Sequence, residues 1–339
     1  MDARGRPVVF MFGGQGSQHY HMGRELFDAD STFRTWLLRG DELFRRVKGR
    51  SLIEVMFDRS RSRADPFDRI SETHPAIVLV EFALAQALLV RGVEPDVLIG
   101  YSLGEFAAAA VSGVAPFEDV FMAVLRQAEL VVECCSEAGM TAVIGDVRLF
   151  RDEPRLFAGC ELVSVNFERH FVVAGSLAAL AQVEAELRGR NVLQVRLPVR
   201  YGFHSRWLDP LARVSPALQL SSPPAPPRVA LISCATTGPV SHFDHRHIWQ
   251  VIRTPVRFAD TIEKLEHPER YVYVDLSPSG TLATFVKNIL PGHAEATVVP
   301  IMTPFGGARE MLSEAIARID AAVHGGTSRA RPDGIGARA

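Results

Sequence analysis

The stretch GYSLGEF, residues 100–106, constrains this chain more than any other part of its sequence. It follows an apolar, strand-like run and leads directly into alanine-rich sequence with the character of a helix. Ser102 stands between Gly100 and Gly104, where larger side chains would collide if the chain turned sharply from strand to helix. We therefore expect a turn that exposes the Ser102 hydroxyl as a nucleophile, with an ordinary tight turn as the alternative.

Strand-like and helix-like runs alternate through the first part of the chain. Residues 7–12 (PVVFMF) are predicted to form a buried strand that ends in a glycine-rich loop, GGQGSQ, at residues 13–18. Residues 74–92 have the apolar character of a helix and lead to the strand before Ser102. This alternation predicts an α/β fold, in which helices cover both faces of a parallel sheet.

Residues 140–197 interrupt this pattern with a different order of strand-like and helix-like runs. These runs follow the order strand, helix, strand, strand, helix, strand, which is typical of a ferredoxin-like unit. We therefore expect a small domain inserted in a larger one that comprises residues 1–139 and 198–322. The remainder, residues 323–339, is predicted to be disordered.

Composition limits the classes of protein to consider. The 339 residues are 47% hydrophobic, which suits a globular protein with one large domain or a large and a small one. No apolar run reaches the roughly 20 residues of a membrane span, and a secretory signal is not indicated, so a cytoplasmic location is expected. A net charge of −2 gives no bulk attraction to nucleic acid. The four cysteines have no CxxC spacing, which indicates free thiols.

A serine nucleophile needs a base, and the chain has 11 histidines. His204, in RYGFHSRW, lies where the chain returns from the predicted small domain, and active-site clefts commonly lie at such junctions. The alternative is a core histidine packed by neighbouring aromatic side chains. His242, His245 and His247 are predicted to lie in a polar loop with no helix to set ligand geometry, so no metal site is expected.

Four stretches together resemble the acyl-carrier-protein acyltransferase family, which includes malonyl transacylases of fatty-acid synthesis and acyltransferases of polyketide synthases. The stretches are FMFGGQGSQ (10–18), GYSLGEFAAAAVSG (100–113), NFERHFVVAG (166–175) and GFHS (202–205). The resemblance covers residues 7–320. It implies an α/β-hydrolase-like large domain with an inserted ferredoxin-like domain, in agreement with the order of the runs.

The resemblance also implies a ping-pong reaction. Ser102 takes an acyl group from a thioester and passes it to the phosphopantetheine thiol of a carrier protein, with His204 as general base and then acid. The backbone N–H groups of Gln15 and Leu103 hold the oxyanion. In this family a backbone carbonyl orients the histidine, and Asp209 is the alternative for that role. No bound cofactor is implied; the substrate or acceptor brings the phosphopantetheine, on coenzyme A or on the carrier protein.

The chain departs from this family at the residue that binds a malonyl carboxylate. Malonyl-transferring members carry an arginine about 25 residues after the serine, where it pairs with the carboxylate in a bidentate way. Here that position is Gln127, and Arg126 is one residue early, which rotates its side chain by about 100° on a helix. The apolar spacing places Gln127 beside the buried face and Arg126 nearly opposite, where Glu129 can pair with it. A local bulge would return Arg126 to the substrate.

Further departures concern residues that the resemblance places at the substrate. Tyr101 precedes the serine where malonyl-type members have histidine, and His74 stands where the family has glutamine. RYGFHS, with Phe203, replaces a run like HAFHS, and Asn166 of the third matching stretch is also expected at the substrate. A neutral amide at position 127 would leave a malonyl carboxylate unpaired at a cost of several kcal/mol, so a neutral acyl group is predicted.

These features predict a free-standing acyltransferase of polyketide-type biosynthesis that moves a non-malonyl acyl group onto or between carrier proteins. Three alternatives remain: a hydrolase that removes stalled acyl groups with the same Ser102–His204 pair, a malonyl transferase that uses Arg126, and a non-catalytic module that docks carrier proteins. The intact serine, histidine and glycine loop argue against the last. A carrier protein and an acyl thioester are the expected partners, without nucleic acid or membrane.

Carrier proteins are usually acidic, so arginines near the cleft are candidates for binding them. Arg206, two residues after His204, is the first candidate. Two basic runs are further candidates, with a solvated surface as the alternative: Arg45, Arg46, Lys48 and Arg50, and then Arg59, Arg61 and Arg63.

Overall fold

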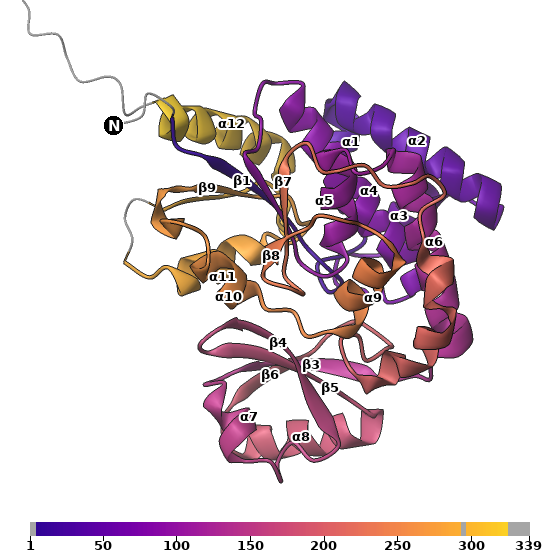
Figure 1. Cartoon of the computed structure of the whole chain (residues 1–339), viewed down its shortest axis with the longest axis vertical. Coiled ribbons are helices and arrows are strands. Elements are labelled where there is room, and N and C mark those ends of the chain that lie inside the picture. Colours follow the sequence, from indigo (N-terminus) through magenta and orange to yellow (C-terminus); the bar gives the residue numbers. More distant parts are fainter. Residues whose placement is uncertain (1–4, 293–295, 325–339) are drawn as a thin grey trace, which may run out of the picture.

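The computed structural model describes residues 5–292 and 296–324, and the strands in this part of the chain form two β-sheets (Figure 1). The larger sheet contains, in spatial order, β10 (Thr297–Pro300), β9 (Val272–Asp275), β1 (Val8–Phe12), β2 (Val97–Gly100), β7 (Ala230–Ser233) and β8 (Gly238–Pro239). All neighbours are parallel except β7 and β8. The α/β class with a parallel sheet is therefore confirmed.

Helices cover both faces of the larger sheet because its strands are apolar on both sides. All five residues of β1 are buried, and alternate residues belong to two different core clusters. One face packs against α4 (Ile70–Leu89), α5 (Gly104–Ser112) and α12 (Ala308–His324). The other packs against α10 (Phe258–Glu263) and α11 (Thr281–Ile289). Continuous apolar runs of this kind are typical of parallel strands buried between helices.

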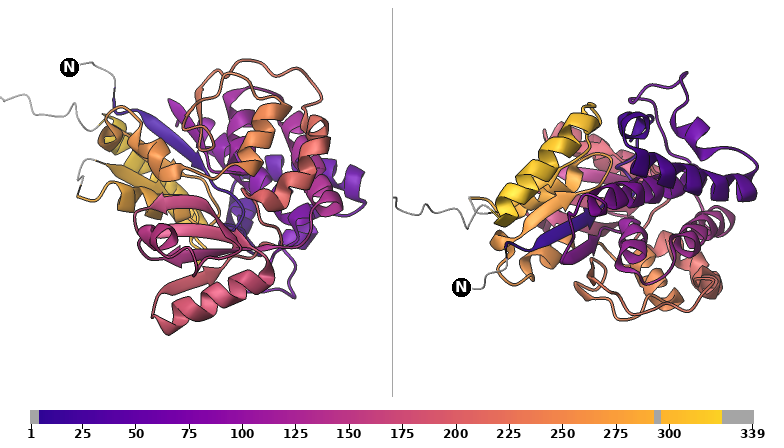
Figure 2. Two further views of the ribbon diagram at one scale, coloured as in Figure 1. Left: turned by 60° about the horizontal axis from the view of Figure 1, so that its bottom comes forward. Right: turned by 90° about the horizontal axis from the view of Figure 1, so that it is seen from above.

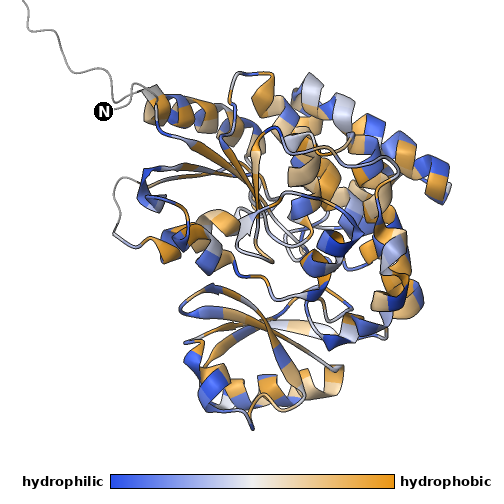
Figure 3. Cartoon of the chain, in the orientation of Figure 1, coloured by the Kyte–Doolittle hydropathy of each residue, from blue (hydrophilic) through white to orange (hydrophobic). Residues whose placement is uncertain are grey.

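The remaining helices of the larger part surround this core. They are α1 (Arg24–Ala29), α2 (Ser31–Lys48), α3 (Leu52–Met56), α6 (Phe117–Cys134), α9 (His245–Arg253) and the 3-10 helices η1 (Arg206–Leu218) and η2 (Pro268–Arg270). Figure 3 shows the strands of the larger sheet in hydrophobic colours and many of the outer helices with one polar side. That distribution is expected where one stripe of each helix faces the core.

The smaller sheet has the predicted ferredoxin-like order. Its elements are β3 (Gly139–Ile144), α7 (Arg148–Asp152), β4 (Cys160–Phe167), β5 (His170–Gly175), α8 (Leu177–Gly189) and β6 (Leu193–Arg196). The strands are antiparallel in the order β4-β5-β3-β6, and α7 and α8 lie on the side that faces away from the larger sheet (Figure 1). Leu180, Val183 and Leu187 of α8 pack on this outer face.

The inner face of the smaller sheet packs on the larger part of the protein, which Figure 2 shows from two further sides. Val172 and Ala174 of β5 belong to the main core cluster. A backbone hydrogen bond from Val256 to the Val163 carbonyl (2.9 Å) joins the two parts. Residues that directly follow β1, β2 and β9 line cavities together with residues of β3 and β5. The small sheet therefore covers the carboxyl ends of the parallel strands, where α/β folds place their ligands.

Helix α4 is long and apolar enough, by length and composition, to cross a membrane, but 89% of its apolar window is buried inside the fold. It is therefore explained as the central core helix. Helix α12 continues to His324, two residues into the stretch predicted to be disordered, because its apolar face packs on the sheet. The rest of that prediction lies outside the described residues. The domain boundaries at 139/140 and 197/198 and the cytoplasmic location stay predictions.

Candidate active site

Ser102 lies on a sharp turn between β2 and α5, with a backbone φ of 56° that non-glycine residues seldom adopt. The two glycines beside it are required by close backbone contacts. A Cβ on Gly100 would stand 2.2 Å from the Glu105 Cα atom, and a Cβ on Gly104 would stand 2.2 Å from the Phe12 carbonyl oxygen. The sequence motif therefore forms the strained strand-to-helix turn expected from it.

His204 meets Ser102 across 102 residues of sequence, with 2.7 Å between the serine Oγ and the histidine Nε2. Its Nδ1 lies 2.8 Å from the carbonyl oxygen of Thr254. Because a carbonyl only accepts hydrogen bonds, Nδ1 carries the proton and Nε2 is left to accept from the Ser102 hydroxyl. The His204 backbone N–H donates to the Ile252 carbonyl (3.0 Å), so the end of α9 holds this residue at two points.

Asp209 does not orient His204, so the alternative role expected for it is wrong. Its carboxylate pairs instead with Arg253 (2.5 Å) and is exposed. The orienting group is the Thr254 carbonyl, which sequence reasoning did not identify because a backbone carbonyl leaves no trace in residue types.

Burial sets the protonation state of His204. The residue is 4% exposed, and burial lowers its pKa from 6.5 to about 4; the Thr254 carbonyl raises the pKa and nearby Arg253 lowers it, but both effects are smaller. At neutral pH the imidazole is therefore uncharged and able to take the Ser102 proton, which is the form that a general base needs.

The glycine loop after β1 passes directly over Ser102. A Cβ on Gly14 would stand 2.8 Å from the Tyr101 carbonyl oxygen and 3.2 Å from the Ser102 Cβ. Gln15 and Leu103, predicted to hold an oxyanion, line one cavity with Ser102. Within the described part of the chain, we find no protein acceptor for either backbone N–H. The Gln15 side chain donates to Thr73 Oγ1 (3.0 Å) and so ties the loop to α4.

A buried carboxyl group supports this loop, and sequence reasoning missed it. Glu81 of α4 accepts a hydrogen bond from the Gly13 backbone N–H (2.6 Å). Burial raises the pKa of Glu81 well above its usual range, and the carboxyl of Asp275 adds to the shift. The Asp275 pKa is itself raised to about 6 by burial. The signal in the sequence is Glu81 itself, which stands in the apolar run from Ala76 to Ala85.

The cavity beside Ser102, called here the Ser102 cavity, has a volume of about 40 Å³. Its lining includes Gln127, His74 and Phe203, three of the residues predicted to contact substrate. Gln127 is 1% exposed, and its Oε1 atom has no hydrogen-bond partner among the described residues. Both ring nitrogens of His74 also lack a partner there, and burial lowers its pKa to about 3. The described residues thus give the cavity neutral polar groups and no charged partner for a carboxylate.

Arg126 does not line this cavity, so its prediction as a substrate-binding residue is wrong. Its side chain is 46% exposed and lies 3.7 Å from Glu129 on the surface of α6. The helix continues without interruption from Phe117 to Cys134, so the step of about 100° per residue is kept and no bulge turns Arg126 inward.

A second cavity of about 180 Å³, called here the glycine-loop cavity, lies next to the Ser102 cavity, and Tyr101 separates the two. Tyr101 lines both cavities, whereas Asn166 lines only the second. The Tyr101 hydroxyl contacts Ser164 Oγ (2.7 Å) and donates to Asn166 Oδ1 (2.8 Å). Asn166 Nδ2 in turn lies 3.0 Å from His170 Nδ1. Burial raises the Tyr101 pKa, so the phenol stays neutral.

The sequence predicts a polar loop for His242, His245 and His247, but this prediction is wrong because α9 begins at His245. Asp244 caps the helix by accepting from the backbone N–H groups of Arg246 and His247 (3.0 and 2.9 Å). His247 is buried and its Nε2 contacts Glu105 Oε1. Among residues 5–292 and 296–324, no group of three or more His, Cys, Asp or Glu residues is arranged to hold a metal ion.

Arg206, the first arginine proposed to bind a carrier protein, has partners within the protein. Arg206 is 47% exposed, pairs with Glu161 of β4 (2.7 Å) and stacks on Trp207. Its pairing joins the two parts of the chain across the cleft. The role of Arg206 toward a carrier protein stays a prediction.

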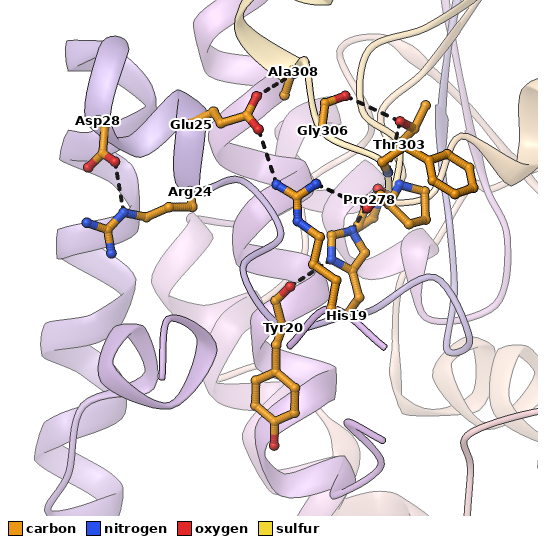
Figure 4. A network of polar contacts seen from close by, with 12 residues as sticks. His19, Tyr20, Arg24, Glu25, Asp28, Pro278, Thr303, Gly306 and Ala308 are labelled. Atoms are coloured by element: carbon orange, nitrogen blue, oxygen red, sulfur yellow. Dashed lines mark hydrogen bonds and ion pairs between the residues drawn. The ribbon is translucent and has the colours of Figure 1, made fainter. Parts of the chain in front are cut away.

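In the two basic runs, every member of the first run and Arg63 of the second are paired with acids. In the first run, Arg45, Arg46, Lys48 and Arg50 each pair with a nearby Asp or Glu. In the second, Arg63 donates to Glu25 (3.2 Å), which also accepts from the Ala308 backbone (2.8 Å), as part of the network in Figure 4. Such pairs are typical of a solvated face and loop anchoring, the alternative stated for these runs.

Comparison with known proteins places these features in context. The sequence model of the acyl transferase domain matches residues 9–325. The polyketide biosynthesis acyltransferase homolog PksD of Bacillus subtilis (strain 168) is 39% identical over 299 residues, which cover 88% of this chain and 92% of that protein. The homolog BaeD of Bacillus velezensis is 40% identical over 300 residues, with 88% and 93% covered.

Solved structures agree with the described fold. A loading acyltransferase from the avermectin modular polyketide synthase superposes with a TM-score of 0.83 at 26% identity, and covers 92% of this chain and 99% of its own. The malonyl CoA-acyl carrier protein transacylase of Coxiella burnetii superposes with a TM-score of 0.76 at 22% identity, a likeness that bears on the fold alone.

Proposed function

Since the chain belongs to the acyl transferase domain family, we propose that it is an acyltransferase of polyketide biosynthesis that carries a neutral acyl group on Ser102. The acyl group comes from a thioester and goes to the phosphopantetheine thiol of a carrier protein. The observation that carries this proposal is the 2.7 Å contact between Ser102 Oγ and the uncharged His204 Nε2. The likeness to PksD and BaeD, both polyketide biosynthesis acyltransferase homologs, supports the assignment to polyketide biosynthesis.

In the first half of the proposed reaction, Ser102 Oγ attacks the thioester carbonyl carbon while His204 Nε2 takes the hydroxyl proton. The backbone N–H groups of Gln15 and Leu103 are the donors to the developing oxyanion. When the carbon–sulfur bond breaks, His204 returns the proton to the leaving thiol. In the second half, His204 takes the proton of the incoming thiol, the sulfur attacks the ester, and the proton goes back to Ser102.

Two features of the Ser102 cavity support a neutral acyl group. A carboxylate placed there would meet the amide of Gln127 and the uncharged imidazole of His74, and none of the described residues that line the cavity has a cationic side chain. A buried charge without a partner costs several kcal/mol. The volume of about 40 Å³ also suits a short acyl chain. The polar atoms of Gln127 and His74 that lack partners favour a chain that carries a hydroxyl or amide over a purely hydrocarbon one.

The glycine-loop cavity fits the pantetheine arm. It lies on the other side of Tyr101 and is lined by backbone of the glycine loop and by the polar side chains of Ser17, Asn166, His170 and Thr281. An arm with two amide groups needs donors and acceptors of this kind along an otherwise apolar channel. We assign this cavity to the arm of either coenzyme A or a carrier protein.

Hydrolysis of the acyl ester is the second candidate function. The Ser102 cavity has room for water, since a single ordered water needs about 10–15 Å³ of such volume. His204 Nε2 would take a proton from a water molecule beside it, as it takes the proton of the incoming thiol, and the water oxygen would attack the ester. Transfer and hydrolysis share the first half-reaction and differ only in the acceptor.

The test uses carrier protein charged with acetyl and, separately, with malonyl groups. Intact-protein mass spectrometry should show the acetyl group on wild-type enzyme and none on Ser102→Ala. The isolated acyl enzyme is then incubated with acceptor carrier protein or with buffer alone. Transfer to the carrier protein faster than loss in buffer supports the transferase, and rapid loss in buffer supports the hydrolase. Labelling by malonyl alone would refute the proposed specificity.

A further inference from the structure

Glu105 is a buried acid at the start of α5, and the reaction proposed above gives it no role. It lies three residues after Ser102, and its side chain is 1% exposed. One carboxyl oxygen accepts a hydrogen bond from Ser233 Oγ at the end of β7 (2.8 Å). The other contacts Nε2 of His247, which is 142 residues away in sequence and lies in the first turn of α9. The contact thus joins the helix behind the serine to α9.

The far end of α9 holds the histidine base. The Ile252 carbonyl, in the last turn of α9, accepts from the His204 backbone N–H (3.0 Å), and the Thr254 carbonyl, one residue past its end, accepts from His204 Nδ1 (2.8 Å). A helix of nine residues is about 13 Å long and behaves as a stiff rod on this scale. Glu105 therefore fixes one end of a rod whose other end sets the position of the imidazole.

We propose that Glu105 and His247 are positioning residues that set the distance between the Ser102 hydroxyl and the His204 imidazole. This inference rests on the proposed function, because it assigns a task within the same Ser102–His204 reaction. The pair acts through α9 and touches neither substrate nor the reacting atoms.

Packing alone does not explain the pair. Phe243 contacts both Phe106 of α5 and the His247 ring, so apolar contacts already hold the two helices together. A buried carboxyl–imidazole pair is costly to desolvate and is a poor source of stability compared with apolar side chains of similar size. Unlike apolar contacts, the hydrogen bond between Glu105 and His247 is directional, so it fixes both the rotation and the axial position of α9. A misplacement of about 1 Å at the reacting atoms can cost about 100-fold in rate.

Three variants separate positioning from stability. His247→Leu removes the contact but leaves a buried carboxyl without this partner, so it is expected to lower the melting temperature as well as the rate. The double variant Glu105→Gln/His247→Leu removes the buried carboxyl too and should regain much of that stability while still lacking the contact. Glu105→Gln alone keeps an oxygen that accepts from His247 Nε2, and the Ser233 hydroxyl can reverse its role toward the new amide.

The rate of Ser102 acylation is measured in single turnovers with saturating acetyl-pantetheine, alongside the KM and the melting temperature. We expect the double variant to acylate about 10- to 100-fold more slowly with KM within about twofold of wild type. Glu105→Gln should stay within about threefold of wild type. The matched control is Arg91→Leu, which breaks the pair of Arg91 with the buried Asp30 far from Ser102 and should lower stability without slowing acylation.

A double variant that acylates at the wild-type rate would overturn the inference, as would a Glu105→Gln variant as slow as the double one. If the rate of every variant simply follows its melting temperature, including that of Arg91→Leu, the pair is structural and the inference is wrong. Wild-type enzyme that forms no ester on Ser102 would instead refute the proposed function.

Discussion

Replacing Gln127 by arginine should change the preference of the Ser102 cavity from neutral acyl groups to malonyl. Gln127 is 1% exposed and lines that cavity, so the guanidinium of Gln127→Arg would lie beside the position of a malonyl carboxylate and could pair with it. His74 contributes no charge of its own at neutral pH, because burial lowers its pKa to about 3. The introduced arginine would therefore be the cation that the wild-type cavity lacks.

The size of the effect follows from the cost of the missing partner. Breaking a buried ion pair by removal of one member costs about 3–5 kcal/mol, and each 1.4 kcal/mol corresponds to a factor of ten. Gln127→Arg should therefore raise the malonyl acylation rate about 10²- to 10³-fold relative to the rate with acetyl. The longer side chain also takes room from a cavity of about 40 Å³, so neutral groups larger than acetyl should react more slowly.

The assay is a competition between acetyl- and malonyl-CoA in single turnovers, with both acyl enzymes quantified by intact-protein mass spectrometry. Gln127→Met is the size control, which removes the amide without adding charge and should not gain malonyl activity. Arg126→Ala should leave both rates unchanged, because Arg126 is exposed and faces Glu129. A wild-type enzyme that takes malonyl as readily as acetyl, or a Gln127→Arg variant that gains no malonyl preference, would refute the reasoning.

Four further predictions concern the elements around the site. Gly104→Ala places a Cβ 2.2 Å from the Phe12 carbonyl oxygen and must displace the glycine loop, so acylation measured in single turnovers should fall at least about 100-fold; an unchanged rate would contradict the assignment of the oxyanion donors. Because the pKa of His204 is lowered to about 4, the acylation rate should stay level from pH 8 to about 5 and fall only toward pH 4, and an inflection near 6.5 would show that His204 is not the buried base described here. The pKa values of His204 and His74 in the folded chain, about 4 and about 3, both lie below 6.5, so these histidines bind more protons in the unfolded chain in this window. Each of them therefore lowers the free energy of unfolding as pH falls below 6.5, by up to about 1.4 kcal/mol per unit, whereas the raised pKa values of Asp275 and Glu81 act in the opposite direction. In denaturant titrations the stability of His74→Phe relative to wild type should therefore rise as pH falls below 6.5, and a difference that does not change with pH would exclude this contribution. Because burial raises the pKa of Glu81, the folded protein loses stability as pH rises through that pKa. Glu81→Gln cannot ionise and keeps an acceptor for the Gly13 N–H. Its melting temperature should therefore exceed that of wild type under alkaline conditions and not under acidic ones.

The parts of the site that could be predicted from sequence are those that local rules or the family resemblance specify. Gly100 and Gly104 follow from the steric demands of the turn, and the opposite faces taken by Arg126 and Gln127 follow from helical periodicity. The pairing of Ser102 with His204 joins residues 102 apart, and it was inferred from the order of recognisable motifs rather than from the chemistry of either residue alone.

The supporting contacts could not be predicted because they depend on how distant elements pack. Glu105 meets His247 over 142 residues, and Glu81 meets the Gly13 backbone over 68. No local pattern relates such positions, and one partner of the second contact is a backbone N–H that any non-proline residue would supply. The Thr254 carbonyl is hidden for the same reason. A buried acid in an apolar run indicates that a partner exists but not which one.

The chain enters the small sheet at β3 and leaves it after β6, and these two crossings bear on the length of acyl chain that the protein accepts. Met140, near the start of β3, and Leu197, directly after β6, stand beside these crossings. They are joined by a backbone hydrogen bond (3.0 Å), and both line the Ser102 cavity. One wall of the cavity thus belongs to each sheet. A rigid-body tilt of the small sheet about this two-stranded hinge would widen or narrow the cavity without any change in the residues that line it. Substitutions at Met140 or Leu197 would then shift chain-length tolerance in two ways, through the tilt of the small sheet and through the side-chain volume at the cavity wall.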